Sequence, residues 1–242
     1  MNKLSSKRQP IKAMILAAGR GNRFRPLTDT IPKPLIEVCG KPLIEYHIEK
    51  LAAAGITDIV INHAWLGHKL EAALGCGKRW GVNLHYSAEP KGGLETAGGI
   101  INALPLLGDL PFLVINGDVY SDFEFDQLIE QAQKMTDQTD QKAHLILVPS
   151  PEHNASGDFG LLDSQEDNQK VCETGDYTFA GLSILKPELF AGLEVGFIKL
   201  APILRQAMSN QQVTGSVFEG FWSDVGTYER LEATEEVLCP KK

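Results

Sequence analysis

The amino-acid sequence predicts an α/β fold, with a Rossmann-like, mostly parallel mixed sheet covered by helices on both faces. Short apolar runs alternate with helix-patterned stretches through residues 11–150, the order expected of parallel strands joined by crossover helices. A loop rich in glycine, proline and basic residues follows the first apolar run, and acidic residues follow two later runs. Because ligands of such sheets bind beyond the carboxyl ends of the strands, we expect the functional site in these loops.

The spacing of apolar residues assigns each element in the first part of the chain. Apolar runs predict strands at 11–18, 58–62, 82–89, 111–116 and 143–150. Apolar residues at helical spacing predict helices at 42–55, 66–74, 96–104 and near 124–134. The polar stretch that begins at the end of the last helix, residues 133–142, is predicted to be a surface connection.

After residue 150 the sequence becomes β-rich, and we expect a β-rich insertion there. The segments FGLLD, QKVCE and YTFAGLSIL have strand-like composition with little helix between them. A helix at 199–208, two strands and a C-terminal helix at 227–238 are predicted to follow. We therefore expect a single domain over 11–238, preceded by a flexible N-terminus at 1–10.

Composition and charge exclude several classes of function. With 23 basic against 31 acidic residues, the net charge is −8, which argues against general nucleic-acid binding because affinity for a phosphate backbone needs a basic face. No apolar run approaches the ~18 residues of a membrane span. Without a C-x-x-C pair or a disulfide framework, we expect a reduced, cytoplasmic protein. The cysteines are Cys39, Cys76, Cys172 and Cys239.

The segment LAAGRGNRFRPLTDTIPKPL, residues 16–35, has the features of a phosphate-binding loop. Gly19 and Gly21 let the backbone approach an anion closely. Arg23 adds a planar fork of donors, and three prolines stiffen the path to Lys33. The segment lacks the third glycine of a Rossmann fingerprint and the G-K-[ST] of a P-loop. The alternative interpretation is a tight turn with its arginines in solvent.

Two aspartates far apart in sequence occupy similar strand-to-loop positions. Asp118 follows an apolar strand in VINGDVY, and Asp224 lies in FWSDVGT. Two such carboxylates, if they converge, suit Mg²⁺, which takes one or two protein carboxylates together with substrate phosphates. The alternative is that each aspartate caps a helix or a turn.

Several histidines and a tryptophan are not assigned to the site. His63 and Trp65, in NHAWLG, are predicted to form a packed structural corner. His47 lies on the apolar face of a predicted helix and is expected in the core. For His153, in PEHNASGDFG, closure over a ligand and solvent exposure both remain open.

Four motifs together resemble those of the sugar-1-phosphate nucleotidyltransferases: LAAGRGNRFRPLTDTIPKPL, LETAGGI, NGD and WSDVGT. The resemblance runs from about residue 11 to residue 238. It implies the GT-A-like nucleotide-diphospho-sugar transferase fold, with a nucleotide-binding part at 11–150 and a sugar-binding part, including the C-terminal helix, at 151–238. It also implies that a nucleoside triphosphate and a sugar 1-phosphate give a nucleotide sugar and pyrophosphate with Mg²⁺.

The resemblance also implies a role for each matching residue. Arg23 and Lys33 are the implied catalytic residues, and Asp118 and Asp224 the implied metal ligands. The implied nucleotide-binding residues are Ala18, Gly19, Gly21, Arg23, Lys33, Glu89, Gly93, Thr96 and Gly98. The implied sugar-phosphate-binding residues are Asn116, Gly160, Glu173 and Lys199.

One position departs from the family pattern. Many relatives have a Glu-Lys-Pro whose lysine touches the sugar phosphate, whereas this chain has CETG, with Thr174 in place of the lysine. The residue that binds the acceptor phosphate is therefore open, and Lys199 and Arg205 are candidates.

The favoured hypothesis is a monomeric uridylyltransferase that uses UTP and an N-acetylmuramate-type sugar 1-phosphate, with no nucleic-acid or membrane partner. A second hypothesis keeps the chemistry and changes the substrates, to a glucose-1-phosphate thymidylyl- or uridylyltransferase or a mannose-1-phosphate guanylyltransferase. A third is a non-catalytic, nucleotide-sensing module. Joint retention of the two basic and two acidic residues argues against the third.

Overall fold

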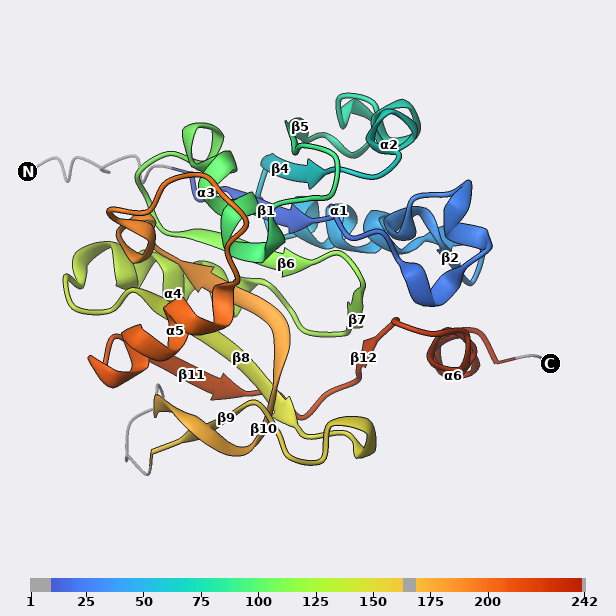
Figure 1. Ribbon diagram of the computed structural model, residues 1–242. Helices are drawn as coiled ribbons and strands as arrows, with labels where there is room; N and C mark the ends of the chain where they lie inside the picture. Colours follow the sequence, from blue (N-terminus) through green and yellow to red (C-terminus); the bar gives the residue numbers. More distant parts are fainter. Residues whose placement is uncertain (1–9, 163–168, 241–242) are drawn as a thin grey trace, which may run out of the picture.

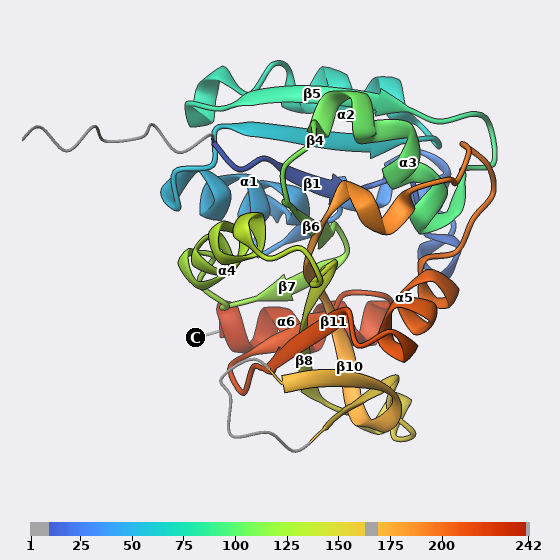
Figure 2. The ribbon, with the colours of Figure 1, turned by 90° about the vertical axis from the view of Figure 1, so that its left-hand side faces the viewer.

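The computed structural model describes residues 10–162 and 169–240. The N-terminus that we expected to be flexible lies outside the described residues, apart from its last residue. The main sheet has the strand order β11-β8-β10-β6-β1-β4-β5, and β9 pairs with β10. It extends from β5 at one end to β8–β11 at the other (Figures 1 and 2).

Two kinds of strand pairing make up the main sheet. The strands β6, β1, β4 and β5 are parallel to one another, and β11 is parallel to β8. The long strand β10 is antiparallel to both β6 and β8. The predicted mixed, mostly parallel sheet is therefore confirmed. Its strands are β1 (Ala13–Leu16), β4 (Asp58–His63), β5 (Asn83–Ala88), β6 (Phe112–Asn116), β8 (Ala143–Pro149), β9 (Phe159–Leu161), β10 (Gln169–Leu185) and β11 (Val213–Val217).

Helices cover both faces of this sheet, as predicted. On β1, Ala13 and Ile15 face one core cluster and Met14 faces the other, because successive side chains of a strand point to opposite faces. The first cluster is closed by α1 (Leu43–Ala53), α2 (Gly67–Leu74) and α4 (Asp126–Asp137). The second is closed by α3 (Glu95–Leu107) and α5 (Leu200–Ser209).

The structure corrects several predicted boundaries. The β-rich part after residue 150 is not set apart from the sheet, because β10 lies between β8 and β6. Its segments QKVCE and YTFAGLSIL form one continuous strand. The stretch 133–142 is only partly a connection, since α4 continues to Asp137; glutamine and lysine are good helix formers there.

Short elements in the loops had no periodic signal to reveal them. The segment after β1 contains three turns of 3-10 helix, and the strands β2 (Glu37–Val38) and β3 (Lys41–Pro42) form a small hairpin. The strand β7 (Val119–Ser121) pairs with β12 (Trp222–Asp224) in a separate two-stranded sheet. Pairings of two or three residues are too short for hydrophobic alternation to predict.

A third core cluster joins the segment after β1 to the C-terminal helix α6 (Tyr228–Leu238). Its buried members are Phe24, Ile36, Val38, Leu43 and Val225, with Leu231 and Leu238 of α6 packed against them. The Tyr228 ring packs edge-on against Phe24 at 5.0 Å between centroids. Its hydroxyl donates a hydrogen bond to the Phe24 carbonyl oxygen over 3.1 Å. The opening loop is thereby fixed to a helix about two hundred residues away.

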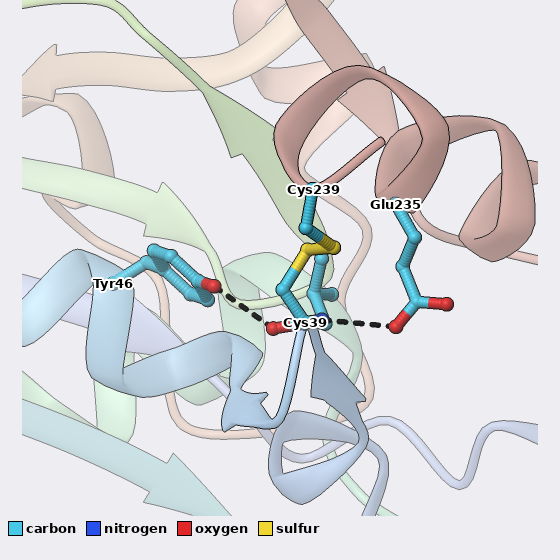
Figure 3. Close-up of a disulfide and its surroundings, with 5 residues drawn as sticks. Cys39, Tyr46, Glu235 and Cys239 are labelled. Atoms are coloured by element: carbon cyan, nitrogen blue, oxygen red, sulfur yellow. Dashed lines mark hydrogen bonds between the residues drawn. A yellow bond between two sulfur atoms is a disulfide. The ribbon is translucent and has the colours of Figure 1, made fainter. Parts of the chain in front are cut away.

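A disulfide reinforces the same contact. Cys39 lies at the two-residue turn of the β2–β3 hairpin and is bonded to Cys239, which follows α6 (Figure 3). The Cys39 amide also donates to the Glu235 carboxylate over 2.9 Å. The expectation that the cysteines are unpaired is wrong for this pair, because 200 residues separate its members and no sequence pattern marks such a partnership. Cys76 and Cys172 are free.

Across the described ranges, the helices are too short or too polar to cross a lipid bilayer.

Two buried histidines make the fold sensitive to acid. Burial lowers the pKa of His47 and of His144 from 6.5 to about 4. As pH falls below 6.5 the unfolded chain binds protons that the folded protein resists, so the free energy of unfolding should fall by about 2 kcal/mol per histidine at pH 5. The double variant His47→Gln/His144→Gln should lose this slope when unfolding is followed between pH 7 and 5. The exposed His68→Gln should keep it; an unchanged slope in the double variant would contradict the assignment.

The disulfide between Cys39 and Cys239 can be tested by counting the cysteines that react with a thiol reagent. Under denaturing, non-reducing conditions a thiol reagent should label two cysteines of the oxidised protein and four after reduction. Cys239→Ser should lower the free energy of unfolding by up to ~5 kcal/mol, the chain-entropy value for so long a loop. The exposed Cys76→Ser is the matched control and should change little. Labelling of all four cysteines without reduction would show that the bond does not form.

Candidate active site

The larger of two neighbouring cavities lies at the carboxyl ends of the parallel strands. It has a volume of about 910 Å³. Its walls come from the loops that follow β1, β4, β5 and β6, with Phe197 from the segment before α5. Strand register explains this convergence, because Leu16 at the end of β1 is paired with both Asn62 and Asn116 at the ends of β4 and β6. Chain segments leaving these strands must therefore meet at one edge.

Three hydrogen bonds fix the walls of this first cavity. The Ala17 amide donates to the Asn62 side-chain oxygen over 2.8 Å, and the Asn62 amide group donates to Glu89 over 2.6 Å. The other Glu89 oxygen accepts from the Leu94 amide over 2.8 Å. Burial raises the pKa of the Glu89 carboxyl, and these hydrogen bonds oppose that shift. Gly99 passes so close that an added Cβ would lie 2.4 Å from Glu89 and 2.8 Å from Asn62.

The loop after β1 holds Lys33 against the cavity. Gly21 has a φ of +69°, and a Cβ there would lie 3.0 Å from both Lys33 and Thr28. Only glycine combines this backbone conformation with so close an approach. The Lys33 side chain is buried, and its Nζ is 2.5 Å from Oδ2 of Asp118. The loop lysine therefore neutralises Asp118, which follows the neighbouring strand β6.

A second cavity, of about 400 Å³, adjoins the first at Asn116 and Asp118. Asp224 also lines it, because β7 and β12 are paired and the Val225 amide donates to the Asp118 carbonyl over 2.8 Å. Arg230 and His153 contact opposite oxygens of Asp224, at 3.2 and 3.3 Å. The remaining lining residues are Arg23, Val119, Asn154, Asp158, Thr178, Phe179 and Trp222.

The donor set around Asp118 and Asp224 fits a Mg²⁺ ion that is completed by substrate. Across the residues that the structure describes, no group of three or more His, Cys, Asp or Glu side chains is placed to hold a metal. Asp224 ends β12, and Asp118 comes directly before the partner strand β7. Two carboxylates at one cavity are what Mg²⁺ uses when phosphates and water supply its other ligands.

The structure brings most of the sequence-predicted residues to these two cavities. The first cavity is lined by Ala18, Gly19, Lys33, Gly93, Thr96, Asn116 and Asp118. The second is lined by Arg23, Asn116, Asp118 and Asp224. Arg23 therefore belongs to the second cavity and not to the wall that holds Lys33.

Other expected residues lie outside both cavities. Glu89 and Gly21 support the wall from behind. Gly98 is required by packing, since its Cβ would lie 1.9 Å from the Gly196 carbonyl oxygen, and Gly160 packs in the same way against Thr174. The side chains of Glu173, Lys199 and Arg205 are exposed on other parts of the surface.

Among the lining residues that sequence reasoning did not assign to the site, four stand out. Trp65, which we expected in a packed corner, lines the first cavity with the Arg20 guanidinium 4.3 Å from its ring centre. Phe197 also lines it, although 69% of this apolar residue is exposed. Glu95 lines it with a φ of +61°, a strained backbone that is often found at functional sites. Arg230 was not considered because it lies on an ordinary amphipathic helix.

Comparison with known proteins identifies the class. Residues 12–239 match the family model described as Nucleotidyl transferase, so the chain belongs to the nucleotidyl transferase family and is an enzyme of the sugar-1-phosphate nucleotidyltransferase type. It is 53% identical over 226 residues to the N-acetylmuramate alpha-1-phosphate uridylyltransferase of Neisseria meningitidis serogroup B, covering 93% of this chain and 97% of that protein.

More distant relatives agree with this class. The chain is 33% identical to the mannose-1-phosphate guanyltransferase of Hypocrea jecorina over 89% of its own length, but it spans only 61% of that protein. A solved structure of UDP-glucose pyrophosphorylase with UDP-glucose superimposes with a TM-score of 0.77 at 21% identity, covering 96% of this chain and 100% of the other. That likeness confirms the fold, including its GT-A-like character.

The hydrogen-bonded wall gives a prediction for the first cavity. Gly99→Ala adds one methyl group between Glu89 and Asn62 and should weaken nucleotide binding by about tenfold, because the loops after β1 and β5 lose their common support. Equilibrium titration with a nucleoside triphosphate measures this. Ala103→Gly, on the same helix, controls for a general loosening of α3 and should leave the affinity nearly unchanged. Equal affinity in Gly99→Ala and the unaltered protein would refute the role of this wall.

Proposed function

We propose that the protein transfers a uridylyl group from UTP to N-acetylmuramate α-1-phosphate, giving UDP-N-acetylmuramate and pyrophosphate, in the recycling of cell-wall peptidoglycan. The observation that supports it most is the pair of cavities that meet at Asn116 and Asp118, one large enough for a nucleotide and the other for a sugar phosphate. The 53% identity to an N-acetylmuramate alpha-1-phosphate uridylyltransferase over nearly the whole chain supports the choice of substrates.

The chemistry proposed here needs charge control and no general base. The attacking atom is a phosphate oxygen, and a phosphomonoester with a second pKa near ~6 is mostly dianionic at pH 7. The difficulty is the approach of this dianion to a triphosphate, since two like charges ~4 Å apart repel by ~4 kcal/mol at an effective dielectric constant of ~20. Lys33 in the first cavity and Arg23 in the second would offset this repulsion. Lys33, on the nucleotide side, would also stabilise charge on the leaving pyrophosphate.

Asp118 and Asp224 are the residues that would hold Mg²⁺. When bound, the ion supplies positive charge to the phosphate oxygens of both reactants. For the carboxylates to hold the ion, Lys33 would move away from Asp118, and Arg230 or His153 from Asp224, because each carboxylate is in contact with these side chains. These bases then become free for phosphate oxygens, so that one charge exchange prepares both the acids and the bases.

The division of labour along the chain follows the cavities. We propose that residues 11–150 supply the nucleotide-binding part, with Gly19, Gly93 and Thr96 along the nucleotide. Residues 151–238 supply the sugar side through His153, Asn154 and Thr178. Glu89 and Gly98 would act on the nucleotide only through the loops that they position. Both parts belong to one domain because they share the central strand β10.

Other substrates of the same type are the second candidate. The identity to a mannose-1-phosphate guanyltransferase keeps a guanylyltransferase open, and a glucose-1-phosphate thymidylyl- or uridylyltransferase would use the same cavities. Base and sugar choice depend on a few contacts, each worth about 1–3 kcal/mol.

We further propose that the protein is a monomer in the cytoplasm. In that reducing compartment the disulfide between Cys39 and Cys239 would form only transiently.

A matrix of nucleoside triphosphates against sugar 1-phosphates, scored by pyrophosphate release, tests the proposed function. UTP with N-acetylmuramate α-1-phosphate should give the highest kcat/KM. Asp118→Asn keeps the size of the side chain but removes its charge, and should abolish release at every Mg²⁺ concentration. Asp140→Asn, an exposed change outside both cavities, is the control and should behave as the unaltered protein. No release with any pair would reject the enzyme; a preference for another pair would reassign its substrates.

A further inference from the structure

The second cavity contains an arginine that neither the motifs nor the comparisons assign. Arg230 lies in the first turn of α6, where its backbone amide donates to the helix-capping hydroxyl of Thr227 over 3.4 Å. The side chain lines the second cavity beside Asp224, and 21% of it is exposed. The helix that carries it is fixed to the opening loop by the contacts of Tyr228 with Phe24 and by the third core cluster, so the guanidinium is held by a rigid element.

Only part of this guanidinium is paired. Nη1 contacts Asp224 Oδ2 over 3.2 Å. Nε and Nη2 are buried, and they have no hydrogen-bond partner among the residues that the structure describes. Buried donors that stay unpaired cost about 1–3 kcal/mol each. Buried donors of this kind are satisfied by ordered water or by a bound ligand, and the second cavity, which Arg230 lines, has a volume of about 400 Å³.

A second guanidinium faces the first one. A Cβ built on Gly226 would lie 2.3 Å from Nη2 of Arg230 and 2.9 Å from Nη2 of Arg23. These two nitrogens are therefore within about 5 Å of each other, a distance at which like charges repel appreciably. Asp224 is the carboxylate in contact with Arg230, and it is shared with His153. The two arginines bring positive charge to the wall of the second cavity, which both of them line. Gly226 allows their close approach, because a Cβ at this position would clash with both guanidinium groups.

The geometry points to Arg230 as the residue that, together with Arg23, binds the phosphate of the acceptor sugar 1-phosphate. This inference rests on the proposed function. A phosphate dianion has oxygens enough to satisfy both forks and charge enough to offset their repulsion. The position also fits the proposed placement of the two substrates, with the nucleotide in the first cavity and the sugar phosphate in the second. Lys33 lines the first cavity, both arginines line the second, and Asp118 lines both.

This assignment fills the place of the lysine that Thr174 replaces. Lys199 and Arg205, the candidates from sequence, have exposed side chains outside both cavities. Arg230 reaches the site from the opposite side of the second cavity, through a helix that follows β12. The chain would therefore hold the acceptor phosphate with an arginine fork from α6 instead of a lysine from β10.

Steady-state kinetics with each substrate varied separately tests the inference. Arg230→Met keeps the bulk of the side chain but loses its charge, and should raise the KM for the sugar 1-phosphate by about tenfold or more while the KM for UTP stays within about twofold. Arg230→Lys should recover part of the loss, because a point charge replaces a fork. Arg79→Met is the matched control: its guanidinium also pairs with a carboxylate, Glu45, but on a surface outside both cavities.

Three results would overturn the assignment. A rise in the KM for UTP alone would make Arg230 a ligand of the nucleotide. A change only in the Mg²⁺ concentration needed for half-maximal rate would show that Arg230 acts on the charge of Asp224 and not on the sugar phosphate. Unchanged constants in a folded Arg230→Met protein would make it a structural residue. Melting temperatures of all variants show whether each one folds.

A binding experiment separates this inference from the proposed function. Calorimetric titration with inorganic phosphate, without nucleotide, should give weaker binding in Arg230→Met and in Gly226→Ala, whose methyl group enters the space between the arginines. Arg79→Met should bind phosphate as the unaltered protein does. If no substrate pair releases pyrophosphate but this difference is present, the proposed function fails and the phosphate site stands; equal binding in all variants rejects the site.

Discussion

The parallel pairing of β1 with β4 on one side and β6 on the other is the constraint on which the rest of the structure depends. It brings Leu16, Asn62 and Asn116 into one row, so three loops far apart in sequence leave the sheet at the same edge. Each loop then contributes what its own residues allow: a cationic turn after β1, Trp65 after β4, and Asp118 after β6. The register of a few backbone hydrogen bonds thus decides where charge and aromatic surface are gathered.

The two aspartates of the site are each paired with a basic side chain. Lys33 neutralises Asp118, and Arg230 neutralises Asp224, whose other oxygen lies 3.3 Å from Nε2 of His153. In a protein of net charge −8, two of the basic side chains of the site are therefore held against carboxylates. These pairs explain why a metal and a polyphosphate would favour each other's binding. A metal that binds the carboxylates leaves the basic side chains free for phosphate oxygens, and phosphates that bind the basic side chains leave the carboxylates free for a metal. The side chains that pair with one another in the structure are thus the same ones that would contact the metal and the phosphates.

Most elements could be predicted from the sequence, because apolar periodicity is strong in α1 and in the buried strands. The site could be predicted only in part. Gly19, Lys33 and Asp118 stand in recognisable motifs at strand ends, but the approach of Asp224 to Asp118 depends on a pairing of three-residue strands that has no sequence signal. Glu89 was expected at the nucleotide, yet its oxygens are used by Asn62 and Leu94. Arg230 and the Cys39–Cys239 bond were missed because long-range docking of α6 brings them into place.

The late position of α6 in the chain has a consequence for its synthesis. The strands that form most of the first cavity emerge early from the ribosome, whereas Asp224 and Arg230 follow only near the end. A product of premature termination that ended before α6 would therefore lack Arg230 from the wall of the second cavity. It would also leave Phe24, Ile36 and Val38 of the third core cluster without Leu231 and Leu238, so the loop after β1 would lose its support from α6.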